Sequence, residues 1–316
     1  MSSKILITGS VAYDLLLQSD NSFADALRGA ALEHLSVAFL APHFRRHHGG
    51  TGANIAWNLN LMGASPLLVS TVGNDGAPYM ALLRERGIAT DRMETLPDHA
   101  TATAIVATDS GERQITFFHP GADAFGSWPD LSEDREEIAW AIVSPRAVTM
   151  MLRAVEWCSA QKIPVLFDPG QQMQAFSDDE LRRTVHRASG VIVNDFEAQM
   201  LAGRLGMTEA EFAKSIPLLI ITRGEKGCSL YDNGERTDIA ACTPEKVLNP
   251  TGAGDAFRAG FLTGLTSGWT LLKSCQLGAA LGSFVVEIEG TLLEDVDKEE
   301  VMARMEGAYG GLGIGY

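Results

Sequence analysis

Short apolar runs alternate with amphipathic stretches along most of this 316-residue chain. The apolar runs are rich in β-branched residues and end at turn residues, which is typical of strands buried on both faces. They predict strands at residues 5–9, 67–72, 138–143, 163–168, 191–194 and 218–222. The amphipathic stretches predict helices at residues 53–62, 78–86, 146–161, 178–188, 252–265 and 271–286. This alternation predicts an α/β fold with a mainly parallel sheet flanked by helices.

Two stretches, residues 12–47 and 100–119, interrupt the alternation. Runs typical of antiparallel hairpins occur within them at residues 37–40, 44–46, 103–106 and 114–118. Because the two stretches flank the first segment that contains helices, we expect them to form a small, discontinuous β lid over the main domain. We also expect this lid to be the contact surface of a homodimer.

Composition and charge exclude several classes of protein. With 46% hydrophobic and 21% charged residues, the chain has the balance of a soluble globular protein. Its 25 Lys and Arg against 40 Asp and Glu give a net charge of -15, which opposes contact with nucleic acid. The four cysteines lack C-x-x-C spacing, so we expect buried thiols. No segment approaches the roughly 20 apolar residues of a membrane span, and we expect a cytoplasmic protein with no membrane contact.

The sharpest motif is NPTGAGDAF at residues 249–257. Gly252, Ala253 and Gly254 allow a helix to begin with bare amide N–H groups, and such a terminus attracts phosphate. Asp255 lies in the first turn of that helix, where it is placed to accept a proton from a hydroxyl that attacks phosphorus. Glycines followed by an aspartate also fit an ordinary turn and helix cap. No G-x-x-x-x-G-K-[ST] segment is present, which excludes a P-loop kinase.

This motif resembles the C-terminal signature of the ribokinase-like (PfkB) family of sugar and nucleoside kinases. A second motif, GGTGANIA at residues 49–56, resembles the N-terminal signature of the same family. Two signatures in the right order identify the chain as a member. The resemblance spans nearly the whole chain and implies one ribokinase-like kinase domain over residues 1–316. It also implies a Rossmann-type sheet, the β lid and ATP as phosphoryl donor.

The resemblance also assigns roles to individual residues. It implies that Asp255 is the catalytic base and that Gly252, Ala253 and Gly254 belong to the catalytic segment. The acceptor would be bound by Asp14, Gly49, Gly50 and Asn54, with the Asp14 carboxylate holding two vicinal hydroxyls. An aspartate after a strand, or a polar residue inside a helix, also fits a purely structural role.

The resemblance also implies a nucleotide site. Asn194 and Glu197 match an N-x-x-E element that organises magnesium and phosphate, although an Asn cap with Glu in the first turn fits as well. The nucleotide segment T-x-G-x-x-G is matched by Thr222, Arg223, Gly224 and Gly227. Arg223 fits either a phosphate ligand or a solvated turn residue. Asp168 ends a strand at the same sheet edge and fits either the lining of the nucleotide cleft or, as the stronger interpretation, a strand-to-loop turn. His47 and His48 face opposite ways on a strand and are expected in the lid, with one of them a candidate substrate contact.

Three segments resemble the bacterial adenosine kinase branch of the family: residues 9–14, 114–122 and 287–291. A purine needs an apolar slot with an aromatic face, and Phe39, Phe117 and Phe118 lie on the expected lid strands. Phe117 and Phe118 point to opposite faces, so at most one of them meets the base, and Phe118 is our candidate. The main hypothesis is therefore phosphorylation of adenosine to AMP, a purine-salvage reaction that uses Mg²⁺ and ATP. The alternatives are a ribokinase or fructokinase that acts on a free sugar, and a non-catalytic nucleoside sensor. Asn249 replaces the aspartate usual in the family, which puts a monovalent-cation site in doubt.

Overall fold

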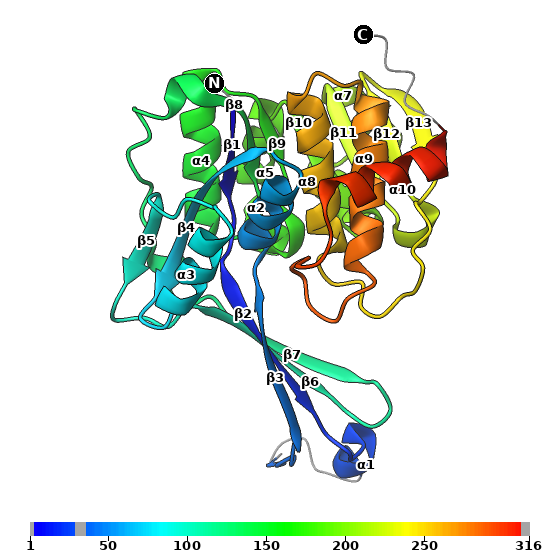
Figure 1. Cartoon of the computed structure of the whole chain (residues 1–316). Helices are drawn as coiled ribbons and strands as arrows, with labels where there is room; N and C mark the ends of the chain where they lie inside the picture. Colours follow the sequence, from blue (N-terminus) through cyan, green and yellow to red (C-terminus); the bar gives the residue numbers. More distant parts are fainter. Residues whose placement is uncertain (1–2, 29–35, 311–316) are drawn as a thin grey trace.

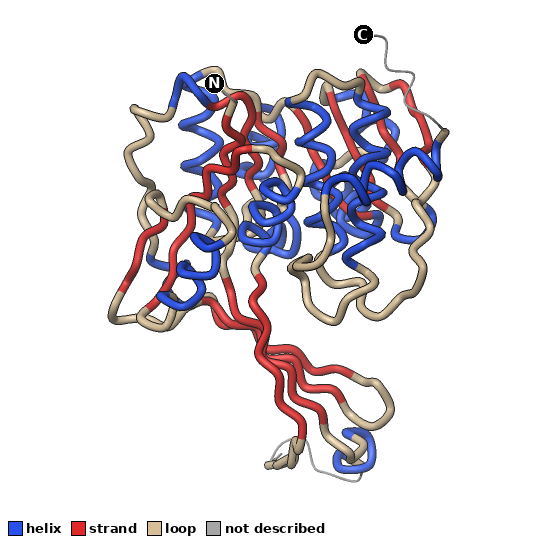
Figure 2. Tube along the Cα trace, viewed as in Figure 1, coloured by secondary structure: helices blue, strands red, loops and turns tan. Residues whose placement is uncertain are grey.

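A large, mostly parallel sheet runs through the molecule, with helices on both faces (Figure 1, Figure 2). The computed structural model describes residues 3–28 and 36–310. Within these residues the sheet order is β13-β12-β11-β10-β9-β8-β1-β4-β5. Its strands are β1 (Lys4–Thr8), β4 (Ser65–Gly73), β5 (Met93–Leu96), β8 (Ile138–Val143), β9 (Val165–Phe167), β10 (Gly190–Asn194), β11 (Leu218–Thr222), β12 (Cys228–Asp232) and β13 (Glu235–Ile239). In the described part of this sheet, β12 pairs in antiparallel register with both of its neighbours, β11 and β13, and the other pairs are parallel.

Alternate side chains of the central strands enter two separate cores. In β1, Ile5 and Ile7 belong to one core, whereas Leu6 belongs to the other. The first core also contains residues of α2, α3, α8, α9 and α10, and the second contains residues of α4 to α7. Burial on both faces explains why these strands are continuous apolar runs in the sequence.

Six described helices, α2, α3, α4, α5, α8 and α9, agree with the predicted amphipathic stretches to within two residues at each end. The described helices are α1 (Phe23–Leu27), α2 (Thr51–Leu61), α3 (Ala77–Glu85), α4 (Val148–Gln161), α5 (Asp178–Arg187), α6 (Asp195–Leu205), α7 (Glu209–Ser215), α8 (Ala253–Thr266), α9 (Leu271–Val285) and α10 (Lys298–Tyr309). The predicted α/β fold class is thereby confirmed. Helices α1, α7 and α10 and strands β5, β12 and β13 had not been predicted.

A smaller sheet projects from the edge of the large sheet at which its parallel strands end (Figure 1). It has the order β3-β2-β6-β7 and is made of β2 (Ala12–Gln18), β3 (His43–Gly49), β6 (Ala102–Thr108) and β7 (Gln114–His119). Two expectations need correction here. Residues 37–40 form no strand, and β2 pairs with β6 in parallel. Residues 29–35 of the expected lid lie outside the described part of the chain.

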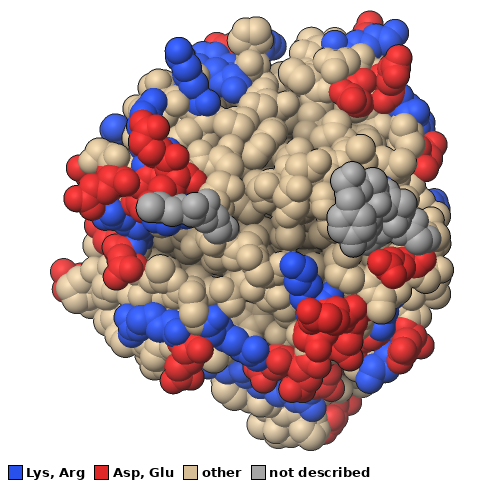
Figure 3. Space-filling view, turned by 45° about the horizontal axis from the view of Figure 1, so that its top comes forward, with Lys and Arg blue, Asp and Glu red and all other residues tan. Residues whose placement is uncertain are grey.

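The charged side chains at the surface and the state of the cysteines can be compared with what the composition predicts. On the face shown in Figure 3, basic and acidic side chains lie interspersed around the margin. The cysteines Cys158, Cys228, Cys242 and Cys275 are buried and free, as expected. Among the described helices, none combines the length and the apolar character needed to span a membrane.

Candidate active site

Predicted site residues, with Ser10 and Ser144 beside them, gather at the carboxyl ends of the parallel strands. Ser10 and Ser144 follow β1 and β8, and Asp168 follows β9, with Ser144 Oγ donating a hydrogen bond of 3.0 Å to Asp168 Oδ2. Asn194 and Thr222 end the neighbouring strands β10 and β11 and pair in register. Ligands of open α/β sheets bind along this edge.

Helix α8 begins at this edge with unpaired amides. Its N-cap, Gly252, has a φ of 87°, a left-handed conformation that favours glycine, and it provides no side-chain cap. Within the described residues, the amides of Gly254 and Asp255 have no hydrogen-bond acceptor. Bare amides at the positive end of a 14-residue helix make a site suited to phosphate.

The Asp255 carboxylate is held from two other parts of the chain. Asn54 Nδ2, on α2, donates a hydrogen bond of 2.8 Å to Asp255 Oδ2. Thr291 Oγ1 in turn donates to Asn54 Oδ1 at 2.9 Å, which fixes the orientation of the amide. Burial raises the pKa of Asp255 to about 7, against the opposing effects of Arg258 and the Asn54 hydrogen bond. A fixed carboxylate with a pKa near neutrality is suited to a general base.

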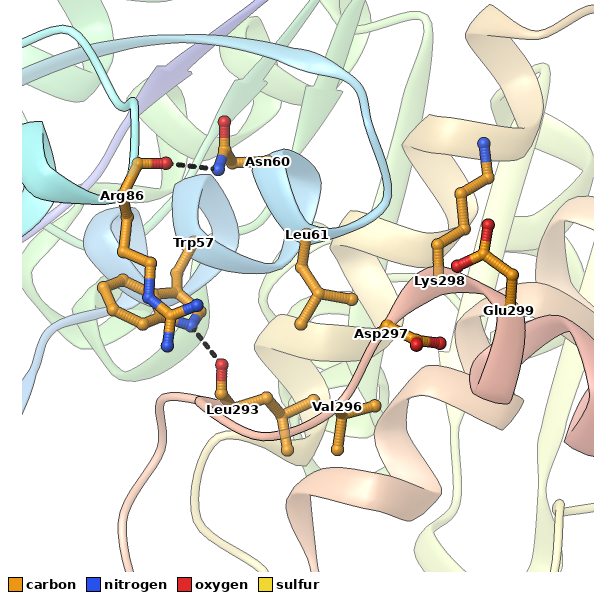
Figure 4. A pocket seen from close by; sticks show the side chains of 9 residues that line it. All are labelled: Trp57, Asn60, Leu61, Arg86, Leu293, Val296, Asp297, Lys298 and Glu299. Atoms are coloured by element: carbon orange, nitrogen blue, oxygen red, sulfur yellow. Dashed lines mark hydrogen bonds between the residues drawn. The ribbon is translucent and has the colours of Figure 1, made fainter.

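The loop that carries Thr291 is anchored on the outer side of α2. Trp57 Nε1 donates a hydrogen bond of 2.7 Å to the carbonyl of Leu293, and the Arg86 guanidinium lies over the indole ring (Figure 4). These residues border a surface hollow of about 290 Å³. Helix α2 carries Trp57, which anchors the loop of Thr291, and Asn54, which donates to Asp255. One helix therefore positions both Thr291 and the hydrogen-bond donor to Asp255.

Asp14 lies on β2 with a carboxylate that lacks a hydrogen-bond partner among the described residues. Burial raises its pKa to about 6, although the nearby His47 opposes this shift. His47 is paired with Asp14 in the β2–β3 register, and its Nε2 atom is buried without a partner in the described residues. Gly49 leaves room for Asp14, since a Cβ atom there would collide with the carboxylate. Gly50, with a φ of 92°, turns the chain from β3 into α2.

Phe118 borders a cavity of about 200 Å³ at the same sheet edge. The residues that line it are Ser10, Phe118, Pro120, Asp123, Ala124, Pro145, Arg146, Ala147, Gln171 and Gln172. Phe118 is 46% exposed, and Phe117 is not among these residues. The charged groups in the wall, Asp123 and Arg146, form a buried ion pair of 2.8 Å, so the cavity has little net charge.

The N-x-x-E element forms a helix cap and leaves one carboxylate oxygen free. Asn194 Oδ1 accepts from the Glu197 amide, and Glu197 Oε2 accepts from the Asn194 amide, each at 2.8 Å. Glu197 Oε1 has no hydrogen-bond partner in the described residues. Burial raises the pKa of Glu197. No group of three or more His, Cys, Asp or Glu in the described residues could hold a metal alone. One free carboxylate oxygen fits a magnesium ion that also binds nucleotide phosphates and water.

The T-x-G-x-x-G segment adjoins this element, but Arg223 is already paired. Its Nε donates to Asp195 Oδ1 at 3.0 Å and its Nη2 to Glu209 Oε1 at 3.4 Å. Thr222 is half-buried, Gly224 is exposed, and Gly227 has a φ of 86°. The Gly227 amide donates to the Gly224 carbonyl at 3.0 Å, and the Thr222 hydroxyl lies 3.4 Å from the Val193 carbonyl. Within the described residues the Gly224 amide is unpaired, whereas the Arg223 charge is largely neutralised by protein carboxylates.

Arg258 was not predicted from the sequence, although it lies at the centre of the site. It is on α8, and its Nε and Nη2 atoms each donate a hydrogen bond of 2.6 Å to the Asp168 carboxylate. Arg258 also affects the pKa values of Asp255 and Glu197. Thr291 was likewise missed as a site residue, whereas His47 was expected in the lid as one of two histidines that could contact substrate. An arginine one turn after the signature aspartate was the only local signal.

Comparison with known proteins agrees with the two signatures. Residues 2–298 match the pfkB family of carbohydrate kinases. The chain is 30% identical to a nucleoside kinase of Methanothermobacter thermautotrophicus, over 97% of this chain and 96% of that relative. The structure of a Burkholderia thailandensis nucleoside kinase with inosine has 33% identity and a TM-score of 0.84, covering 97% of this chain and 98% of that one.

A second solved structure, the nucleoside kinase of Methanocaldococcus jannaschii, is described as an archaeal member of the ribokinase family. It is 26% identical to this chain, with a TM-score of 0.85, and the match covers 97% of this chain and 100% of that chain. The fold, the order of the signatures and the extent of these matches agree. The chain therefore belongs to the pfkB family of carbohydrate kinases.

Proposed function

We propose that this protein is an ATP-dependent nucleoside kinase that transfers the γ-phosphoryl group of MgATP to the 5′-hydroxyl of a ribonucleoside, with adenosine as the first candidate. The observation that carries the proposal is the Asp255 carboxylate, held by Asn54 beside the unpaired amides that begin α8. Retention of this carboxylate argues against a sensor, because binding alone does not require a base.

In the proposed reaction, the acceptor oxygen attacks the γ-phosphorus while its proton passes to Asp255. The bond between the γ-phosphorus and the β,γ-bridging oxygen breaks, and the electron pair leaves with ADP. The amides of Gly254 and Asp255 are placed to bind the transferring group, as donors fixed before reaction lower the barrier most. Ala253 contributes only a methyl side chain to this turn.

The nucleotide would lie across the ends of β10 and β11. The Thr222 hydroxyl and the Gly224 amide are the groups that we assign to its phosphates, and Gly227, with its positive φ, turns the chain beside them. Asn194 orients Glu197, whose free oxygen would hold a magnesium ion that comes with the nucleotide. Magnesium, when bound, neutralises phosphate charge. Arg223 would contribute by fixing Asp195 and Glu209 rather than by binding phosphate directly.

The acceptor would lie between Asp14 and the cavity beside Phe118. An unpaired carboxylate suits the vicinal hydroxyls of ribose, while Gly49, Gly50 and Asn54 border the same place. The cavity offers an aromatic face and the side-chain amides of Gln171 and Gln172, which suits an uncharged nucleobase better than a charged group. The named activities of the relatives support a nucleoside over a free sugar.

We infer that the small sheet acts as a lid and as the contact of a homodimer. Every residue of β7 is exposed, and large apolar side chains including Phe44 and Phe117 are more than half exposed. A second copy that packs on this face would remove apolar area from water. Light scattering should then give twice the chain mass, and Phe44→Glu should give the mass of one chain. A monomeric wild type would contradict this contact.

The test of the proposed function is ADP formation by the purified protein with a panel of acceptors. We expect the highest kcat/KM with adenosine or another purine ribonucleoside, and little turnover without acceptor. A higher kcat/KM for ribose or fructose would replace the nucleoside kinase with a sugar kinase. The absence of turnover with every acceptor, by protein that binds ATP and adenosine, would favour the sensor.

A further inference from the structure

Arg258 is a buried arginine whose guanidinium donates hydrogen bonds to the described residues through two of its three nitrogen atoms. Two of its nitrogen atoms, Nε and Nη2, donate to both oxygens of Asp168 at 2.6 Å. Within the described residues, its third nitrogen, Nη1, has no hydrogen-bond acceptor. The side chain retains 9% of its exposure, and Asp168 retains 1%. The guanidinium fork is thus fixed by Asp168 on its Nε and Nη2 side, and its Nη1 atom remains available to a ligand.

The open nitrogen lies beside the N-terminal turn of α8. Arg258 follows Gly254 by four residues, a spacing that puts two positions on one face of a helix. Helical side chains lean toward the N-terminus, which brings the guanidinium back along the helix. A Cβ atom on Gly254 would lie 2.8 Å from Arg258 Nη1. Glycine at position 254 therefore gives the guanidinium access to the turn that carries the unpaired amides.

We propose that Arg258 is a further catalytic residue, whose Nη1 atom contacts the phosphoryl group during its transfer. Asp168 then acts as a positioning residue that holds the fork, and Ser144 supports Asp168 through its hydrogen bond. The inference rests on the proposed kinase function. It adds no atom or proton to the reaction, because Arg258 only stabilises the negative charge that develops on the transferring oxygens.

A purely structural role for Arg258 makes different predictions. A buried arginine–carboxylate pair can anchor a helix to a strand end, and its loss then lowers stability without a selective effect on the chemical step. Such a role does not explain the unpaired Nη1 atom or the glycine at position 254 beside it. The experiment must therefore separate loss of folding from loss of transition-state stabilisation.

The first arm is kinetic. Arg258→Met should lower kcat by about 100-fold to 1,000-fold, as expected for the loss of one fixed donor, with little change in the KM for ATP. Arg258→Ala should regain activity when guanidinium is added, because the vacated site and Asp168 can bind that cation. Arg92→Met is the matched control, because Arg92 is also ion-paired to a buried carboxylate, that of Asp134. Asp134 also pairs with Lys4 at the start of β1, so this ion pair lies at the opposite edge of the sheet from the site. Arg92→Met should lower thermal stability and leave kcat unchanged.

The second arm measures binding instead of turnover. MgADP with fluoroaluminate, an analogue of the transferring phosphoryl group, should stabilise the wild type against heat more than MgADP alone. Arg258→Met should lose this additional stabilisation and keep that of MgADP. If Arg258→Met does not fold, Arg258→Lys, which keeps the charge without the fork, should show the same selective loss.

Near-normal kcat in folded Arg258→Met, no response of Arg258→Ala to guanidinium, or an undiminished effect of fluoroaluminate would each overturn the inference. Failure of the proposed function has a different signature, because it would appear in the wild type as no turnover with any acceptor. Failure of the Arg258 inference would appear only in variants of an active enzyme.

Discussion

Asn54 Nδ2 donates a 2.8 Å hydrogen bond to Asp255 Oδ2 and so joins two segments that are 201 residues apart in the sequence. The bond connects the N-terminal signature, on α2, to the C-terminal signature, on α8. Asn54 is 4% exposed, and its oxygen accepts from Thr291. The two family signatures therefore meet at the proposed base, and a contact between Asn54 and substrate remains a prediction.

Loss of this hydrogen bond should raise the pKa of Asp255 further. Asn54→Leu removes the donor at similar volume, and a hydrogen bond to a charged group contributes about 1.5–3 kcal/mol, or roughly one to two pKa units. The acid limb of kcat/KM against pH should move upward by that amount. The control is Asn60→Ala, at the far end of α2, where the side chain donates a hydrogen bond to the Arg86 carbonyl. An unshifted limb in Asn54→Leu would contradict the role of this bond.

The activity and the stability of the ligand-free protein should respond to pH in opposite directions. Burial raises the pKa of Asp255 from 3.8 to about 7, so the folded state binds more protons than the unfolded state between these values. Stability then falls as pH rises from about 4 to 7, whereas kcat/KM rises as the base ionises. Asp14, with its pKa raised to about 6, contributes to stability in the same sense.

Thermal unfolding of the wild type and of Asp255→Asn across this pH range checks the sign. The asparagine cannot ionise, so the variant should gain stability relative to the wild type as pH rises toward 8. The gain should vanish near pH 4, where both side chains are neutral. A difference in melting temperature that does not vary with pH would contradict the raised pKa.

The fold was predictable where burial leaves a local pattern. Continuous apolar runs identified the central strands, but the β12–β13 hairpin was missed although its turn has a signal. Asn233 and Gly234 both have positive φ, as a two-residue hairpin turn of the Asn-Gly type requires. Residues 37–40 were wrongly predicted as a strand, because an apolar run alone cannot show whether a pairing partner exists.

The site was predictable only as far as its motifs are continuous in sequence. Asp255 lies inside a nine-residue string, whereas Thr291 and Arg258 depend on partners distant in the sequence. The Arg258–Asp168 pair spans 90 residues, and the Thr291–Asn54 bond spans 237. These contacts, which the local sequence does not show, place both residues in the site.

Asp14 should determine the preference for ribonucleosides over deoxyribonucleosides. A carboxylate left unpaired in a closed site costs about 1–3 kcal/mol, which corresponds to roughly tenfold to a hundredfold in kcat/KM. We expect adenosine to be preferred to 2′-deoxyadenosine by at least about tenfold. Asp14→Ala should weaken adenosine binding and reduce this ratio. An unchanged ratio in the variant would mean that another residue recognises the diol.

The activity should not depend on a monovalent cation. Asn249 Nδ2 donates to the carbonyl of Glu289 at 2.9 Å, and Asn249 Oδ1 accepts from the Thr251 amide at 3.0 Å. The side-chain amide thus joins two loops, whereas an ionised aspartate has no N–H group to donate to the Glu289 carbonyl. Replacing K⁺ by tetramethylammonium should leave wild-type kcat unchanged, whereas Asn249→Asp should become dependent on K⁺. A wild type that needs K⁺ would contradict this interpretation.

The measurement that tests the account most directly is the turnover of Asp255→Asn against the wild type with saturating MgATP and adenosine. Asparagine is nearly isosteric with aspartate but cannot accept the proton. The account predicts that kcat falls by about 100-fold to 10,000-fold, while ADP and adenosine still bind and the variant unfolds cooperatively. Turnover by Asp255→Asn at the wild-type rate would show that Asp255 is not the base and would contradict the proposed mechanism.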